Sequence, residues 1–425
     1  MVNDDLPPVP KPGDKGLMPL SILEIVGLDP IEHVGGAPSG VSSASSGSNA
    51  SDEMLFITQG LPWSFGYGSR AFGGTILAIG IQAAYSSLVY KADVEVANQY
   101  ALYSFQGSFL SPTQLDRPLR LRVTSVRDTR SFVTRVIQGY QYTDDKQNQI
   151  RHTFVATADF ARRGQPDVEG SAFSVQPVNP ATNMPWEPPE NLPDIMAVNE
   201  QREREYHAQI KAGAAPDPTV ERAIKLERLM WTPISRLNEL RPLPTSPVHE
   251  TITAFDIRLP TSQDNLAVTQ KTAADYLRWT ESPQQLLSAD PDRTRRSGWT
   301  FASLNAALLG LSLDYYLAGV GLFFSKVPRS AALFVSLDFS LRFHTADIDA
   351  TAWHLREVKA IAGSEGRTFS EAKMWRENKL VATISQQCFC RPVAAEGAAP
   401  RKEAISQSNP ITGNMQKVKP GGSKL

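Results

Sequence analysis

Cysteine is scarce in this chain. The 425 residues contain two cysteines, Cys388 and Cys390, in a single C-x-C pair. Two cysteines alone cannot complete a structural zinc site, which takes four ligands. The pair therefore predicts reduced thiols in a compartment that is not oxidising.

An excess of either charge is also absent. The chain has 43 Lys and Arg against 44 Asp and Glu, which gives a formal net charge of −1. Proteins that bind nucleic acid usually carry a basic excess, so this balance argues against that class. The first residues, "MVNDDLPPVPKPGDKG", contain neither a basic nor an apolar region, and no secretory signal is expected.

Charge is nearly missing from two long runs. One is "GGTILAIGIQAAYSSLVY" at 73–90, and the other, "AALLGLSLDYYLAGVGLFF" at 306–324, is almost long enough to cross a bilayer. Asp314 lies near the middle of the second run, where a membrane would make it cost about 2.5–3.5 kcal/mol. We therefore expect no membrane span but a buried helix over 302–324, in which a lone carboxylate requires a functional reason.

Composition divides the chain into segments. The N-terminal segment contains a Pro-rich start, a short apolar helix expected at 17–33 and a Gly/Ser-rich loop. A later segment, between the two structured units, is Pro-rich and contains charged sequence typical of helices. The expected boundaries are 1–53 for the N-terminal segment, 54–160 for a first structured unit, 161–247 for a linker, 248–392 for a second structured unit and 393–425 for a flexible tail.

The two structured units repeat one another in outline. Each places its uncharged helix before four β-like segments, and short matches such as "RSF" and "RTF", then "VAT" and "VAT", recur in the same order. Because an uncharged helix must be covered on nearly every side, a curved antiparallel sheet is expected to wrap each one. The predicted class is α+β, with strands near 99–110, 118–127, 131–142, 150–160, 249–258, 273–281, 331–344, 351–361, 367–376 and 379–391.

Several motifs are more specific than this outline. They are "FGGTILAIGIQAA", "FQGSFLSP" and "VRDTRSFVTRVIQGYQ" in the first half, and "LLGLSLDYYL", "VSLDFSLRFH" and "LVATISQQCFCR" in the second. With these motifs the chain resembles the acyl-CoA thioesterase II family, and its peroxisomal members in particular. The resemblance implies a double hotdog fold and hydrolysis of fatty acyl-CoA, with no cofactor or metal.

The resemblance implies a catalytic set of Asp314, Ser336 and Gln386, all in the second half. The residues themselves agree in part, because Asp314 is the only charge of its helix and the first-half helix has none, which predicts one active site per chain. The strand "VSLDFSLRFH" alternates, so Ser336 is expected on its polar face. Gln386 shares a face with apolar Ile384 and must therefore be hydrogen-bonded.

The implied mechanism is attack by a water molecule that Asp314 polarises and that Ser336 and Gln386 position. Burial is expected to raise the pKa of Asp314 towards that of a general base. Backbone N–H groups at a helix start, either at 72–74 or at the equivalent position of the second half, are candidates for the oxyanion hole. The chain departs from the family where Tyr103, Gln106 and Phe339 stand in places that often hold histidine.

Other enzyme classes fit less well. No G-x-S-x-G occurs, which argues against a serine hydrolase with a nucleophile elbow. A hotdog enoyl-CoA hydratase would use an Asp–His pair, and no histidine is near Asp314 in sequence. A hotdog protein that binds acyl-CoA without cleaving it stays open as the non-enzymatic alternative.

The chain ends in Ser423, Lys424 and Leu425, after a tail rich in Gly, Pro, Ala, Ser and Lys. A C-terminal S-K-L is an address for the peroxisomal import receptor. We therefore expect the peroxisome matrix as the location, with that receptor and acyl-CoA as partners. A homo-oligomer is expected as well, because hotdog proteins seldom act alone.

Overall fold

The structure is a computed structural model that describes residues 22–31, 53–64, 70–143, 149–164, 168–169, 173–178, 183–216, 221, 224, 238–243, 265–325 and 331–392. Several sequence predictions lie outside these residues: the Pro-rich start, the Gly/Ser-rich loop, the strand near 249–258, the tail at 393–425 and its targeting tripeptide. Much of the expected linker at 161–247 also lies outside them.

One antiparallel sheet of thirteen strands forms the body of the described chain. Its spatial order is β1-β2-β4-β5-β6-β3-β10-β13-β12-β11-β8-β7, and β9 pairs with β13 off this path. The strands are β1 (Leu28–Pro30), β2 (Glu53–Thr58), β3 (Tyr100–Phe109), β4 (Arg120–Asp128), β5 (Phe132–Tyr142), β6 (Ile150–Arg162), β7 (Asn238–Pro242), β8 (Ala273–Trp279), β9 (Ala331–Ser336), β10 (Asp338–Phe343), β11 (His354–Ser364), β12 (Arg367–Arg376) and β13 (Lys379–Pro392).

The sheet has two halves of the same topology, joined where β3 pairs with β10. In the first half, β2 precedes the central helix and β3 lies at the junction, with β4, β5 and β6 between them. In the second half, β8 precedes the central helix and β10 lies at the junction, with β11, β12 and β13 between them. The prediction of a duplicated α+β unit, a double hotdog, is confirmed. The second half also includes β7, which pairs with β8 and precedes the boundary expected at residue 248.

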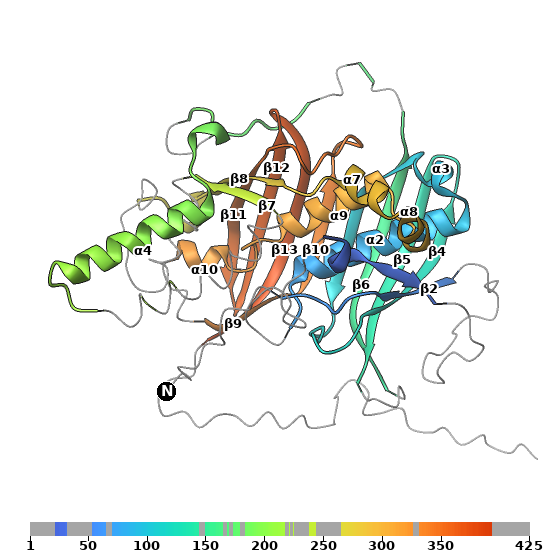
Figure 1. The fold of residues 1–425 in the computed structure, drawn as a ribbon, viewed down its shortest axis with the longest axis horizontal. Helices are drawn as coiled ribbons and strands as arrows, with labels where there is room; N and C mark the ends of the chain where they lie inside the picture. Colours follow the sequence, from blue (N-terminus) through green and yellow to red (C-terminus); the bar gives the residue numbers. More distant parts are fainter. Residues whose placement is uncertain are drawn as a thin grey trace, which may run out of the picture.

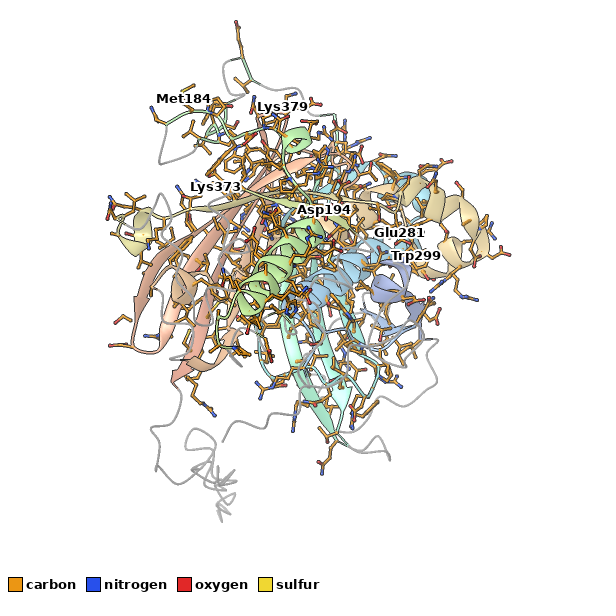
Figure 2. The ribbon with its side chains drawn as sticks, turned by 60° about the vertical axis from the view of Figure 1, so that its left-hand side comes forward. Met184, Asp194, Glu281, Trp299, Lys373 and Lys379 are labelled. Carbon is orange, nitrogen blue, oxygen red and sulfur yellow. The ribbon has the colours of Figure 1, made fainter. Side chains whose placement is uncertain are left out.

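Two central helices, α2 and α9, lie against the same face of the curved sheet (Figure 1). Figure 2 shows Asp194, which caps the start of the charged helix α4, and Trp299, just before α9. The helices are α1 (Ile22–Val26), α2 (Gly73–Lys91), α3 (Val94–Ala97), α4 (Ile195–Lys211), α7 (Pro283–Ala289), α8 (Pro291–Ser297), α9 (Phe301–Leu313) and α10 (Val320–Phe324), with 3-10 turns η2 (Pro189–Asn191) and η3 (Val268–Gln270).

The central helices are buried because they have no polar face to give to water. Every residue of α2 from Gly74 to Leu88 is buried, and so is every residue of α9 from Ser303 to Leu313. Each fully buried Leu or Ile side chain contributes about 1.5–3 kcal/mol to folding. The two helices also touch each other, which brings the first half and the second half into one core.

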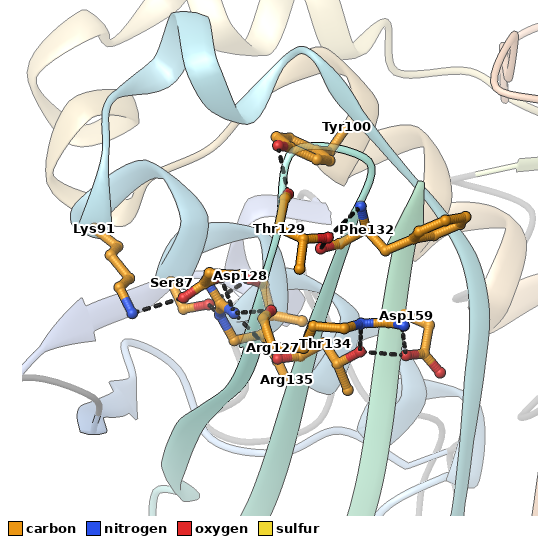
Figure 3. Close-up of polar contacts among 11 residues, drawn as sticks. Ser87, Lys91, Tyr100, Arg127, Asp128, Thr129, Phe132, Thr134, Arg135 and Asp159 are labelled. Atoms are coloured by element: carbon orange, nitrogen blue, oxygen red, sulfur yellow. Dashed lines mark hydrogen bonds and ion pairs between the residues drawn. The ribbon is translucent and has the colours of Figure 1, made fainter. Parts of the chain in front are cut away.

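An ionic cluster around the buried side chain of Arg135 lies at the end of α2, and the "RDTRSF" motif of the first half supplies its Asp128 (Figure 3). The guanidinium of Arg135, in β5, donates to Oγ of Ser87 and to a carboxylate oxygen of Asp128. Lys91, the last residue of α2, binds the other oxygen of Asp128. These cations lie at the C-terminal end of the helix, where its dipole favours positive charge.

The prediction of a single helix over 302–324 is wrong. Helix α9 ends at Leu313, Asp314 is its C-cap, and a second short helix, α10, begins at Val320. Tyr316 has a φ of 55°, a left-handed conformation that cannot continue a right-handed helix. Asp314 is therefore at a helix end and not in the middle of an apolar helix. Among the described residues, no helix has both the length and the hydropathy that a membrane span requires.

Candidate active site

Asp314 lies where the two halves of the molecule meet. It caps the C-terminal end of α9 and contacts the N-terminal end of α2, whose Gly74 N–H donates a hydrogen bond to its carboxylate. The residue is 4% exposed. The first half thus supplies the helix start and the second half supplies the carboxylate.

Glycine is required at the start of α2 because of this contact. A β-carbon on Gly73 would lie 2.7 Å from Oδ2 of Asp314, and one on Gly74 would lie 2.7 Å from the carbonyl oxygen of Leu311. Real side-chain carbons do not approach an oxygen this closely. Residues 72–74 were candidates for the oxyanion hole, and of these the N–H of Gly74 donates to Asp314.

Burial raises the pKa of Asp314 to about 7, because removal from water penalises the charged form. Hydrogen bonds from Gln386 and Gly74, and the positive charge of Arg356, act in the opposite direction. The helix dipoles also oppose each other here, since the end of α9 disfavours a carboxylate and the start of α2 favours one. The result is a carboxyl group that changes its protonation state near neutral pH.

Gln386 connects Asp314 to Ser336. Its Nε2 donates to Oδ1 of Asp314, and its Oε1 accepts a hydrogen bond of 3.1 Å from Oγ of Ser336. The side chain is fully buried on β13. With the amide nitrogen bound to an acceptor and the amide oxygen bound to a donor, the orientation of Gln386 is fixed.

The three predicted catalytic residues therefore form one hydrogen-bonded chain, Ser336 to Gln386 to Asp314. They come from β9, β13 and the end of α9. Their catalytic role stays a prediction that this geometry permits.

Ser336 reaches this chain through a β-bulge, and its predicted face is wrong. Ser336 pairs with Cys388, whereas Ser340 pairs with Ser385, so one extra residue lies between the two registers. The extra residue turns Ser336 to the inner face that Gln386 occupies, and it leaves Leu337 37% exposed. Strict alternation from 335 to 344 does not hold, because a bulge reverses the order of faces.

Cys388 lies directly beside the hydrogen-bonded chain. It pairs with Ser336, and its Sγ lies 3.9 Å from Oε1 of Gln386. Burial, together with the negative charge of Asp314, raises the pKa of this thiol to about 12. Cys388 is therefore a neutral thiol near the site, and both cysteines are free thiols.

The three positions at which the sequence departs from the resemblance make structural contacts. Gln106 accepts a hydrogen bond from Ser340 and donates to Ser104, at the junction of β3 with β10. Phe339 is buried on the inner face and stacks on Phe105. Tyr103 contacts the ring of Phe132. These residues give the junction packing and polar contacts that need no titratable ring.

Sequence reasoning missed Arg356, which the structure places beneath the turn that follows α9. It is fully buried on β11 and lowers the pKa of Asp314 through its charge. Its pattern in the sequence, one arginine within a strand, gives no sign of this position. Among the described residues, no group of three or more His, Cys, Asp and Glu has an arrangement suited to a metal ion.

The two halves match the two domains of one protein family. Residues 61–162 match the model "Acyl-CoA thioesterase N-terminal domain", and residues 243–390 match "Acyl-CoA thioesterase C-terminal domain". Together the matches cover more than half of the chain. The chain therefore belongs to the acyl-CoA thioesterase family.

One solved structure supports the same fold, and a second is given with it for comparison. The acyl-CoA thioesterase II TesB2 from Mycobacterium marinum superposes with a TM-score of 0.51 at 18% identity, over 89% of this chain and 99% of the other. A protein of unknown function with a hot dog fold from Alicyclobacillus acidocaldarius has a TM-score of 0.47 at 17% identity, over 82% of this chain and 96% of its own. No curated protein sequence matches the chain.

Proposed function

We propose that this protein is a fatty acyl-CoA thioesterase, which hydrolyses the thioester to a free fatty acid and CoA with Asp314 as general base. The observation that carries the proposal is the hydrogen-bonded chain from Ser336 through Gln386 to a buried carboxylate whose pKa is about 7. Membership of the acyl-CoA thioesterase family supports the same reaction.

In the proposed reaction, Asp314 takes a proton from a water molecule while the water oxygen attacks the carbonyl carbon. The tetrahedral intermediate then collapses, the carbon–sulfur bond breaks, and the proton on Asp314 passes to the departing CoA thiolate. A general base of this kind contributes about 10²–10⁴-fold to the rate when its pKa lies near the working pH. Gln386 and Ser336 hold the carboxylate and the water in position.

The start of α2 is the proposed site for the oxygen that becomes negative. A helix leaves its first N–H groups without acceptors inside the helix. Gly74 N–H binds Asp314, and we assign the N–H of Gly73, the first residue of α2, to the thioester oxygen. Negative charge is favoured there by the helix dipole as well.

The test is release of free CoA from a panel of saturated acyl-CoAs of increasing chain length. We expect hydrolysis by the wild type and a loss of at least ~10²-fold in Asp314→Asn. The matched control is Asp347→Asn, which makes the same change at an exposed carboxylate of the same half, paired only at the surface with Arg376. It should keep wild-type activity.

The panel also separates the alternatives. A wild type that binds acyl-CoA yet releases no CoA above the blank would contradict the proposal and favour a binding protein. Conversion of a 2-enoyl-CoA to its hydrated product, without CoA release, would favour a hydratase. Equal activity in wild type and Asp314→Asn would remove Asp314 from the mechanism.

The cellular setting is a separate proposal that rests on sequence alone. Ser423, Lys424 and Leu425 support delivery to the peroxisome matrix by the import receptor. The hotdog fold supports assembly into a homo-oligomer.

A further inference from the structure

Arg356 is a buried cation that the proposed reaction does not use. Its side chain is fully buried, and its guanidinium makes every one of its polar contacts to groups of the second half. Two of its nitrogens bind the two carboxylate oxygens of Asp275, at 3.0 and 2.6 Å. Asp275, on β8, is buried as well.

The same guanidinium holds the turn that carries Asp314. Its remaining nitrogen donates to the carbonyl oxygens of Ser312, at 2.5 Å, and of Tyr315, at 3.3 Å. The Ser312 carbonyl belongs to the last turn of α9, where a helix leaves carbonyl groups without partners, and the Tyr315 carbonyl lies just beyond Asp314. A cation at this point also complements the dipole of α9.

Arg356 packs against the two tyrosines that follow Asp314. Its guanidinium carbon lies 5.4 Å from the ring centre of Tyr315 and 4.9 Å from that of Tyr316. Tyr316 has a left-handed backbone with a φ of 55°, which a tyrosine adopts only when its surroundings impose it. Arg356 thus supports the strained turn from below.

A buried ion pair is not a good way to stabilise a fold, because the cost of removing both charges from water offsets their attraction. Apolar residues of similar volume at Arg356 and Asp275 would serve stability equally well. The pair therefore requires another explanation, and its contacts with the turn supply one.

We propose that Arg356, anchored by Asp275, is a positioning residue that fixes the turn after α9 and thereby holds the Asp314 carboxylate against Gln386 and the start of α2. The inference rests on the proposed thioesterase function for its catalytic meaning. Its structural part, that Arg356 controls the state of the Asp314 carboxyl group, can be measured without any substrate.

The charge of Arg356 has a second effect on Asp314. It lowers the pKa of the carboxyl group and so limits the increase that burial causes. Burial alone would lower the pKa of Arg356, but the Asp275 carboxylate opposes this effect and the net change is upward, so the guanidinium stays charged. Among the described residues, Tyr315 and Cys388 also interact with Asp314, and burial raises the pKa of each, so both are neutral at the pH values of the test.

The first half of the chain offers a matched control. Arg135 is likewise buried beneath the C-terminal end of a central helix, where it contacts Ser87 and Asp128 (Figure 3). It lies at the end of α2 opposite to the end that meets Asp314. Arg135→Met therefore removes a comparable guanidinium without touching the turn after α9.

The experiment compares the wild type, Arg135→Met and a double variant, Arg356→Met with Asp275→Leu, which removes both charges at similar volume. Two readouts are used: kcat and KM for acyl-CoA hydrolysis, and an infrared titration of the buried carboxyl group, with Asp314→Asn as the subtraction reference. We expect the double variant to lose ~10- to 100-fold in kcat, as a misplaced catalytic group does, with KM within ~3-fold. Its carboxyl titration should move to higher pH, and Arg135→Met should match the wild type in both readouts.

Arg356→Lys covers the case in which the double variant does not fold. Lysine keeps the charge but cannot bind Asp275 and two carbonyls in the fixed geometry of a guanidinium. It should therefore lose ~10-fold in kcat while the carboxyl group titrates close to its wild-type pH. A folded variant at Arg356 with wild-type kcat and wild-type titration would overturn the positioning role.

The two readouts also separate this inference from the proposed function. If the titration moves as expected while the wild type hydrolyses no acyl-CoA, the thioesterase proposal fails and the control of Asp314 by Arg356 stands. If the wild type hydrolyses acyl-CoA and neither readout changes in the Arg356 variants, the thioesterase proposal stands and the control of Asp314 by Arg356 fails.

Discussion

The carboxylate of Asp314 occupies the space that a side chain on Gly73 would fill. A β-carbon at Gly73 would lie 2.7 Å from Oδ2 of Asp314 and 3.4 Å from the ring of Phe109. The two residues belong to different halves of the duplicated fold, so the proposed catalytic carboxylate depends on a glycine in the half that carries no catalytic side chain. With this contact, both units would contribute to the single site per chain that the sequence predicts.

Gly73→Ala should therefore reduce activity more than it reduces stability. The new methyl group must push the carboxylate away from Gln386, and a displacement of about 1 Å in a catalytic group costs about 10²-fold in rate. Steady-state kcat with a hydrolysed acyl-CoA and Tm by circular dichroism would be measured together. Gly310→Ala is the control, because its methyl group would meet the flexible end of Ile81 at 2.8 Å. Equal losses of kcat in the two variants would contradict the explanation.

The rate of hydrolysis should rise with pH through about 7. Asp314 acts as a base only when it is unprotonated, and burial raises its pKa to about 7. The profile of kcat between pH 5 and 9 should show one acid limb with an apparent pKa near this value. A rate that is already constant at pH 5.5 would assign the base to a group with an ordinary carboxyl pKa.

Much of the fold can be predicted from the sequence, because its strongest signals are local. The run without charge at 73–90 became α2 (Gly73–Lys91), since such a helix is stable only when covered on all sides. The second-half segment at 379–391 became β13 (Lys379–Pro392). Repetition of this order in both halves was enough to predict the duplicated topology.

Two wrong predictions at the candidate site share a physical cause. Hydropathy cannot show that Tyr316 adopts a left-handed backbone and that α9 therefore ends at Leu313. It also cannot show that an extra residue near Leu337 reverses the two faces of the strand. Both features are imposed by tertiary contacts, namely Arg356 below the turn and the register with β13 beside the strand. Both features lie at the candidate site, where local pattern and final structure differ most.

The site itself was predictable only in its polar members. Asp314 and Gln386 stand out as polar residues in apolar segments, and the family resemblance added Ser336. Arg356 has no such signal, because its importance comes from contacts between residues far apart in the chain.

The C-terminal tripeptide gives a prediction for cells. A fluorescent protein fused in front of the full chain should gather in peroxisomes, and removal of Ser423, Lys424 and Leu425 should leave it dispersed. The control restores the tripeptide to the end of the truncated chain, which should bring the peroxisomal pattern back. A dispersed full-length fusion would contradict the predicted location.

The last prediction concerns the stability cost of the proposed base. A carboxyl group whose pKa is about 7 in the folded chain and 3.8 otherwise favours folding while it is protonated. This contribution is complete below about pH 4 and is lost as the pH rises through about 7, because ionisation then costs less free energy in the unfolded chain than in the folded chain.

Asparagine cannot ionise, so the stability of Asp314→Asn should not fall with pH for this reason. We expect the free energy of unfolding of Asp314→Asn, relative to that of the wild type, to increase by about 2–3 kcal/mol between pH 5 and pH 8, at 1.36 kcal/mol per pKa unit. The readout is the difference in Tm between variant and wild type at each pH, and a difference that stays constant or shrinks would mean that the carboxyl group ionises at low pH. Such a result would also remove its suitability as a base, so stability and catalysis test the same property of Asp314 independently.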